Sequence, residues 1–206
     1  MSWGIRSGLQ GRVRRTGVIA VAVAAAGGTG ATMSAMAASH TVTFNDLAFF
    51  SSYLPSQSFN SITVDVDVYP VNLTVGNSCN PNAAGAATVV SQSFQPCTNG
   101  PQPNNKRMII DQVLLDFDIS DYVAQIGGPV RRIKFRYKPV AGNVQLVVNG
   151  NCFVQPTFGA INGSGFGFSV NDNGCAVTIK AAPGTAIMQF SLGGDVLFID
   201  NVRASD

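Results

Sequence analysis

Apolar and polar residues alternate along most of the chain after residue 40. The clearest case is residues 61–71, in which every second residue from Ile62 to Val68 is apolar. Strict alternation places one face of a strand in the core and the other in water, which is typical of antiparallel sheets. The same period predicts further strands at residues 40–50, 113–120, 131–138, 144–148, 176–180, 186–192 and 196–202.

Turn signals separate these predicted strands. Asn149-Gly150 and Asn173-Gly174 are dipeptides typical of two-residue hairpins, and Gly193-Gly194 is expected to join two more strands. Residues 120–126 are the best helix candidate, with Ser120 as the N-cap. About eight or nine strands with at most one short helix predict an all-β fold, an antiparallel β-sandwich of the jelly-roll type.

Residues 1–37 have the pattern of a secretory signal peptide. Four arginines precede a short apolar run at residues 18–26, and Ala35-Met36-Ala37 forms an A-x-A cleavage site. The run is shorter than the about 20 residues of a membrane span, so we expect cleavage before Ala38 and no membrane span in the mature protein. An uncleaved anchor is the alternative, and Arg14-Arg15 leaves twin-arginine export open beside general secretion. Residues 38–206 then form one secreted, periplasmic or cell-surface domain.

Low charge excludes several classes of protein. Only 12% of the residues are charged, against about 25% in typical domains, and all 11 acidic residues are Asp. Because the leader removes four arginines, nine Lys and Arg remain against 11 Asp, a net charge of −2. A mildly acidic protein is not expected to bind nucleic acid or an anionic membrane. The low charge also excludes a coiled coil.

The cysteine count indicates disulfides. The mature chain keeps four cysteines, Cys79, Cys97, Cys152 and Cys175. An even number after export predicts two disulfides. Of three possible pairings we favour the sequential one, Cys79–Cys97 and Cys152–Cys175, because each pair brackets a local loop. The first pair lies in a long loop at residues 76–107, which contains a strand-like run at residues 88–94. A zinc site is disfavoured because no C-x-x-C motif is present.

The sequence contains no catalytic constellation. His40 is the only histidine and lies near the mature N-terminus, so Ser-His-Asp and Cys-His mechanisms are not expected. The Asp65/Asp67 and Asp116/Asp118 pairs each share one strand face, and a solvated face explains them better than glycosidase chemistry. We predict that the protein is not an enzyme.

A row of cations is the most distinctive candidate site. At strand spacing, one face of residues 131–138 carries Arg132, Lys134, Arg136 and Lys138. Four like charges repel one another unless something opposes them. One interpretation is a neighbouring strand that supplies Asp116 and Asp118, or Asp65 and Asp67. The other is a binding site for an acidic polysaccharide or another anion.

Aromatic residues offer a second candidate site. Phe166 and Phe168 alternate with glycines in the segment GSGFGF and could form the rim of a site for a neutral sugar. The alternative is a hairpin with one face buried in the core.

Two terminal stretches resemble a known family. Residues 190–202 (FSLGGDVLFIDNV) and 41–47 (TVTFNDL) are similar to the closing and opening strands of secreted bacterial jelly-roll domains of the galactose-binding-like, carbohydrate-binding-module type. The resemblance implies an extracellular jelly roll, in some members a carbohydrate-binding one, with a structural Ca²⁺ held by an Asp near each terminus. The matching positions are Asp46 and Asp200, beside Asn201, and hard oxygen ligands suit Ca²⁺. Many sugar-binding members use an exposed Trp, whereas Trp3 lies in the leader.

These observations predict a secreted, non-catalytic module that binds carbohydrate at the cell surface or in the extracellular matrix. The alternative is a structural or self-assembling surface protein. In its favour, residues 40–46 (HTVTFND) are also similar to the first strand of chaperone–usher pilins. The expected partners are therefore carbohydrate or further copies of the chain.

Overall fold

The computed structural model describes residues 38–76, 80–90 and 106–206. These residues form an antiparallel, sandwich-like β structure, which confirms the all-β fold class. No helix in the described ranges has the length and hydropathy of a membrane span. The helical elements are α1 (Ile119–Ile126), η1 (Phe158–Ala160) and η2 (Ser164–Phe166). The strands are β1 (Ser39–Val42), β2 (Ser52–Tyr53), β3 (Ser58–Ser61), β4 (Val64–Pro70), β5 (Ala86–Val90), β6 (Arg107–Phe117), β7 (Arg132–Val148), β8 (Asn151–Gln155), β9 (Phe168–Asp172), β10 (Ala176–Ala181) and β11 (Phe190–Ser205).

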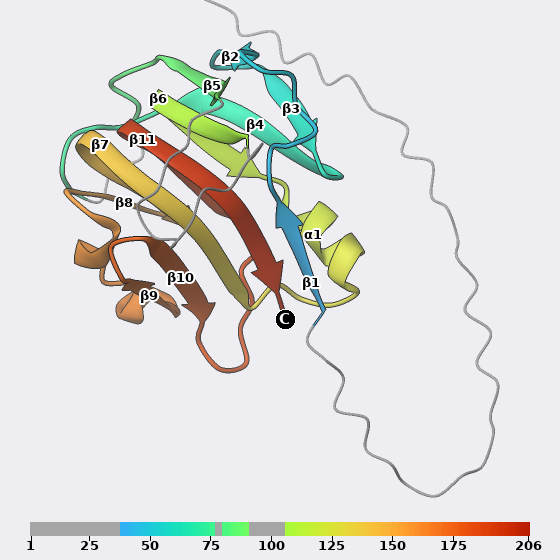
Figure 1. Cartoon of the computed structure of the whole chain (residues 1–206). Helices are drawn as coiled ribbons and strands as arrows, with labels where there is room; N and C mark the ends of the chain where they lie inside the picture. Colours follow the sequence, from blue (N-terminus) through green and yellow to red (C-terminus); the bar gives the residue numbers. More distant parts are fainter. Residues whose placement is uncertain (1–37, 77–79, 91–105) are drawn as a thin grey trace, which may run out of the picture. The chain divides into compact units, whose positions relative to one another are not determined.

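Three long strands form the centre of the sheet. β11 lies between β6 and β7 and pairs with both in antiparallel fashion (Figure 1). The first half of β6 pairs with β5 and the second half with β4. Likewise, the first half of β7 pairs with β10 and the second half with β8. Each half of the central sheet thus has its own flanking strands, and both halves contribute to one hydrophobic core.

The three central strands are irregular at the same level of the sheet. Gln112 of β6 and Gly142 of β7 have φ angles of 54° and 68°. At this level the register of β11 with β7 shifts between Gly194 and Val196, and Gln112 Nε2 donates to Asp195 Oδ1 over 3.3 Å. Extra residues in a strand bend it and increase its twist. These irregularities lie at the same level of the three strands, so we expect the sheet to bend and twist there, between its two halves.

The prediction that Gly193-Gly194 joins two strands is wrong, because both glycines lie inside β11. A Cβ atom on Gly193 would lie 2.3 Å from the carbonyl oxygen of Val113 in β6. A glycine inside a strand often marks such a close backbone approach. The predicted strands at 186–192 and 196–202 thus give way to the single β11, and those at 131–138 and 144–148 merge into β7. Within the described residues the sheet has eleven strands, where the sequence predicted about eight or nine.

The predicted hairpin turns and the predicted helix are confirmed. Asn149-Gly150 joins β7 to β8, with the φ angles of 51° and 78° that a type I′ hairpin requires. Asn173-Gly174 joins β9 to β10. The helix expected at 120–126 is confirmed as α1, but its N-cap is Asp118 rather than Ser120. The Asp118 carboxylate accepts a hydrogen bond from the Ser120 N–H over 2.8 Å, since a side-chain acceptor satisfies a free N–H of the first turn.

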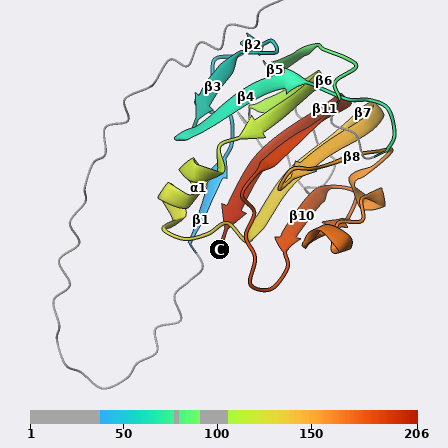
Figure 2. The same ribbon diagram turned by 180° about the vertical axis from the view of Figure 1, so that it is seen from behind.

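The first and last strands pair with each other. β1 runs antiparallel to the end of β11, with Val42 opposite Val202, and α1 lies beside β1 (Figure 2). The Tyr122 hydroxyl of α1 donates to the Val202 carbonyl over 3.0 Å. His40 Nε2 lies 2.7 Å from the Ile62 carbonyl oxygen, a contact that ties β1 to the segment before β4.

The predicted Cys152–Cys175 disulfide is wrong. Cys152 is opposite Val147 near the end of β7, whereas the Cys175 carbonyl accepts a hydrogen bond from the Tyr137 N–H in the first half of that strand. At about 3.3 Å per residue, these two positions, ten residues apart on β7, are separated by about 33 Å along the strand. A disulfide joins Cα atoms at most about 7 Å apart. Cys175 is disulfide-bonded, while Cys79, Cys97 and their predicted pairing lie outside the described residues.

We therefore expect that Cys175 is linked to a cysteine other than Cys152. Digestion of the oxidised mature protein under non-reducing conditions, followed by mass spectrometry, tests this directly. The peptide that contains Cys175 should change mass on reduction without releasing the peptide of Cys152. A Cys152–Cys175 peptide as the main product would contradict the strand register.

Candidate functional site

The alternation predicted for residues 131–138 is confirmed in β7. Ile133, Phe135 and Tyr137 are buried in the core, which leaves the intervening residues on the outer face of the sheet. All four predicted cations are exposed there, namely Arg132, Lys134, Arg136 and Lys138. The alternation therefore places a continuous row of cations on the outer face of the first half of β7.

The neighbouring strands extend this cationic surface. On β10, Lys180 is directly opposite Arg132. On β11, Arg203 is directly opposite Lys134. Residues directly opposite one another in a sheet project from the same face, so both additions join the row on β7. We name this exposed surface the basic face: Arg132, Lys134, Arg136, Lys138, Lys180 and Arg203.

The acidic residues expected to oppose the row lie elsewhere, so that interpretation is wrong. Asp67 of β4 is directly opposite Asp116 of β6, in the half of the sheet that β4 flanks. Burial raises the pKa of Asp116, as do the nearby Asp67 and Asp118, although Ser191 lowers it by donating to the carboxylate. An ion pair joins Arg131 to Asp206 over 3.2 Å, and neither residue belongs to the basic face.

One carboxylate does lie at the level of the basic face. Asp200 of β11 is directly opposite Arg136 and only 5% exposed. Burial raises its pKa to about 6, although the Asn201 N–H, Arg107 and Arg136 act in the opposite direction. Arg107, at the start of β6, is itself buried, and this burial lowers its pKa. Asp200 therefore sits within a small charge cluster formed by three strands.

The residues expected to hold Ca²⁺ have separate hydrogen-bond partners. Asp46 accepts from the Ser61 hydroxyl over 2.7 Å and from the Ile62 N–H over 2.8 Å. Asp200 accepts from the backbone N–H of Asn201 over 2.8 Å and from its side-chain amide over 2.9 Å. In the described part of the chain, no group of three or more His, Cys, Asp or Glu is placed to hold a metal ion. Calcium binding stays a prediction.

Near Asp46, a lysine ammonium contacts backbone carbonyls. Lys106 Nζ donates to the carbonyl oxygens of Asn45 and Leu47 and lies 4.8 Å from the centre of the Phe49 ring. Charge-assisted hydrogen bonds and the cation–π contact hold this loop together. The loop presents Phe49 and Phe50 to solvent, a feature that the alternation of residues 40–50 did not indicate.

The two candidate aromatic residues differ in exposure. Phe166 of η2 is 44% exposed, whereas Phe168 of β9 is 3% exposed. Both rings lie edge-on to Phe153, at 5.1 and 5.7 Å between ring centres. The residues before β9 form two short 3-10 turns, η1 and η2, rather than a hairpin. Phe168 is therefore a core residue, and of these two candidates it is Phe166 that offers an exposed ring to a ligand.

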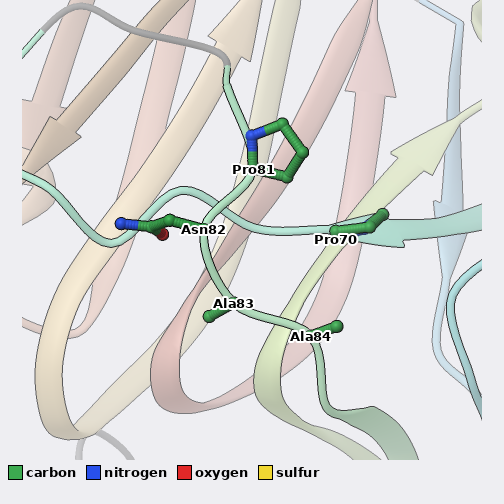
Figure 3. Close-up of a pocket in the computed structure, with 5 residues that line it drawn as sticks. All are labelled: Pro70, Pro81, Asn82, Ala83 and Ala84. Carbon is green, nitrogen blue, oxygen red and sulfur yellow. The ribbon is translucent and has the colours of Figure 1, made fainter.

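A shallow hollow of about 400 Å³ opens on another part of the surface (Figure 3). It lies between the end of β4 and the segment that precedes β5, and it is lined by Pro70, Pro81, Asn82, Ala83 and Ala84. The Asn82 amide already bonds to Leu73 and Thr74, at 2.6 and 2.7 Å. None of the described residues in its lining has a titratable side chain, so this part of the lining offers no acid, base or nucleophile.

Comparison of the chain with protein-family models, curated proteins and solved structures finds no match. Of the sites considered, the basic face joins the largest number of charged side chains on one rigid surface.

Proposed function

We propose that the mature protein is a secreted, non-catalytic binding module whose basic face binds an acidic polysaccharide. The observation that carries the proposal is the register of β11, β7 and β10, which gathers six exposed cations on adjacent strands. Export by the leader at residues 1–37 is part of the same proposal.

Electrostatics favours an extended anion as the ligand. Neighbouring strands lie about 4.8 Å apart, so Arg203, Lys134, Arg132 and Lys180 repel one another across the ladder. An exposed ion pair is worth at most about 1 kcal/mol, and a single small anion would therefore bind weakly. A polymer with repeated carboxylates or sulfates contacts several cations at once and relieves their repulsion.

The uncharged residues of this surface suit a hydroxyl-rich polymer. Thr178 is directly opposite Lys134, and Ser205 is directly opposite Arg132. Hydroxyl groups both donate and accept hydrogen bonds, and a sugar chain offers both functions. These side chains would complement the cations, which can only donate.

The test measures the affinity of the folded mature protein for a polyuronate and a sulfated dextran, with neutral dextran as reference. We expect binding of the two anionic polymers that weakens as salt is added, because salt screens exposed charges. Replacing Lys134 and Arg136 by alanine should weaken binding by about tenfold, since two exposed ion pairs are lost.

Arg131→Ala is the matched control. Arg131 is exposed and adjacent in sequence, but its side chain pairs with Asp206. Its removal should change the affinity by less than about twofold, the effect of a weak surface pair. Equal binding by wild type and by the Lys134→Ala/Arg136→Ala protein would overturn the proposal. So would the absence of binding to either anionic polymer.

A further inference from the structure

We infer that the polymer crosses the strands that carry the basic face, and that Ser169 and Asn171 of the edge strand β9 form a subsite for its sugar hydroxyls. The inference rests on the proposed function and deepens it. It adds the flanking strands β1 and β9 to the binding surface, and it distinguishes an acidic polysaccharide from a polyanion without hydroxyl groups.

Five strands lie side by side at the level of the basic face, in the order β1, β11, β7, β10 and β9 (Figure 1). Because residues directly opposite one another project from the same face, the registers define two rows of outward side chains across all five strands. The first row consists of Thr41, Arg203, Lys134, Thr178 and Asn171. The second row consists of Ser39, Ser205, Arg132, Lys180 and Ser169.

Both rows have cations at the centre and neutral hydrogen-bonding groups at the flanks. The cations lie on β11, β7 and β10, whereas β1 and β9 contribute only hydroxyl and amide groups. Each of the five strands contributes two positions, ten in all, and none of these is acidic. Arg136 and Lys138 continue the cations along β7 beyond the first row. Four intervals of about 4.8 Å make each row about 19 Å long, which suits an extended polymer better than a single small anion.

The alternation within β9 turns its polar side chains outward. Phe168 is buried, and Val170 packs against the same core. Ser169 and Asn171 therefore project from the opposite face, where both are exposed. In the described part of the chain, neither side chain forms a hydrogen bond to another residue. Their donors and acceptors are thus available to a ligand.

At the other flank, a direct contact joins β1 to the cations. Arg203 Nη2 donates a hydrogen bond to Ser39 Oγ over 2.7 Å. A guanidinium has five N–H donors, so this bond leaves other donors of Arg203 for an anion. A carboxylate or sulfate bound by Arg203 would therefore lie beside the hydroxyl groups of Ser39 and Thr41.

The neutral flanks favour a sugar polymer over other polyanions. The cations attract any polymer with repeated negative charges, whatever the chemistry of its backbone. The hydroxyl and amide groups add affinity only where the ligand returns their hydrogen bonds, and sugar hydroxyls both donate and accept. The flanking strands should therefore determine specificity, while the central strands supply the electrostatic attraction.

The test compares a polyuronate with inorganic polyphosphate, which has repeated charges and no sugar hydroxyls, on the folded mature protein. Ser169→Ala/Asn171→Ala should weaken polyuronate binding about fivefold, the effect of two weak hydrogen bonds. The same protein should bind polyphosphate within about twofold of the wild type. Thr41→Val should weaken polyuronate binding about threefold, because a ligand that crosses the five strands reaches both flanks.

Ser58→Ala/Asn60→Ala is the matched control. These two residues are likewise exposed, have the same spacing and lie on β3, which pairs with β4 in the other half of the sheet. Their replacement should leave the affinity for both polymers within about twofold of the wild type, as expected for residues outside the binding surface. Urea denaturation verifies that each variant is folded at the temperature of the binding measurement.

The outcomes separate the two proposals. Equal polyuronate affinity of the wild type and Ser169→Ala/Asn171→Ala would overturn the subsite. Equal losses for polyuronate and polyphosphate would also overturn it, since the effect would not depend on sugar hydroxyls. Full polyuronate affinity in Thr41→Val would overturn the path across the strands. If the wild type itself did not bind polyuronate, the proposed function would be overturned instead.

Discussion

Replacing Gly193 by alanine is expected to lower the free energy of unfolding by about 3 kcal/mol, the upper range for overpacking a core. The added Cβ atom would lie 2.3 Å from the carbonyl oxygen of Val113 and 2.9 Å from the Cα atom of Leu114. Both are backbone atoms of β6 that the strand ladder holds in place. The methyl group can therefore be accommodated only if β6 and β11 move apart.

Gly165→Ala is the matched control, since a Cβ atom there would meet no atom within 4 Å. It should change the free energy of unfolding by less than about 0.5 kcal/mol, as surface substitutions usually do. Urea denaturation of both variants and the wild type measures the effect, and the midpoints can be compared directly where the m-value is unchanged. If Gly193→Ala were as stable as Gly165→Ala, the close approach of β6 and β11 would be contradicted.

Local chemistry explains the parts of the fold that the sequence predicted correctly. The alternation in residues 131–138 needs only a buried face, and β7 supplies one through Ile133, Phe135 and Tyr137. Asn and Gly adopt the positive φ angles of the Asn149-Gly150 turn readily, and the distant Met188 and Gln189 bond to a turn that its own sequence already favours. Such features depend on neighbours in the chain, so the amino-acid pattern is sufficient to predict them.

Features that depend on a distant partner were predicted less well. Gly193-Gly194 has the composition of a turn, and only the approach of β6 shows why small residues are needed inside β11. Cys152 and Cys175 are far apart because they lie beside opposite ends of β7, which their spacing in the sequence does not reveal. In both cases a contact between residues far apart in the sequence decides the structure, and the local pattern does not contain that contact.

The candidate site shows the same division. The four cations of β7 were identified from period two alone. Lys180 and Arg203 were missed because their membership depends on which strands flank β7 and in which register. Lys180 lies at the end of a predicted strand, but the sequence does not show that this strand pairs with β7. Asp200 was noticed for its place near the C-terminus, whereas its charged surroundings come from β6 and β7.

Replacing Phe135 by alanine is expected to cost about 4 kcal/mol of folding stability, within the range for a buried phenylalanine. Its ring is completely buried and packs against Phe158 and Phe190, at 5.2 and 6.0 Å between ring centres. The residue lies between Lys134 and Arg136 on β7, so the same side chain fixes the backbone that carries the middle of the basic face. Thermal and urea denaturation monitored by circular dichroism measure the effect.

Phe166→Ala removes the same atoms from a ring that is 44% exposed and contacts Phe153 edge-on. It should cost no more than about 1.5 kcal/mol, because part of the ring is already in water and the lost aromatic contact is small. Affinity for the anionic polymers should be unchanged, since Phe166 lies outside the basic face. A loss of polymer binding in Phe166→Ala at undiminished stability would instead place the ligand at the aromatic rim. If Phe135→Ala and Phe166→Ala lost similar stability, this would contradict the finding that Phe135 is buried in the core and Phe166 is partly exposed.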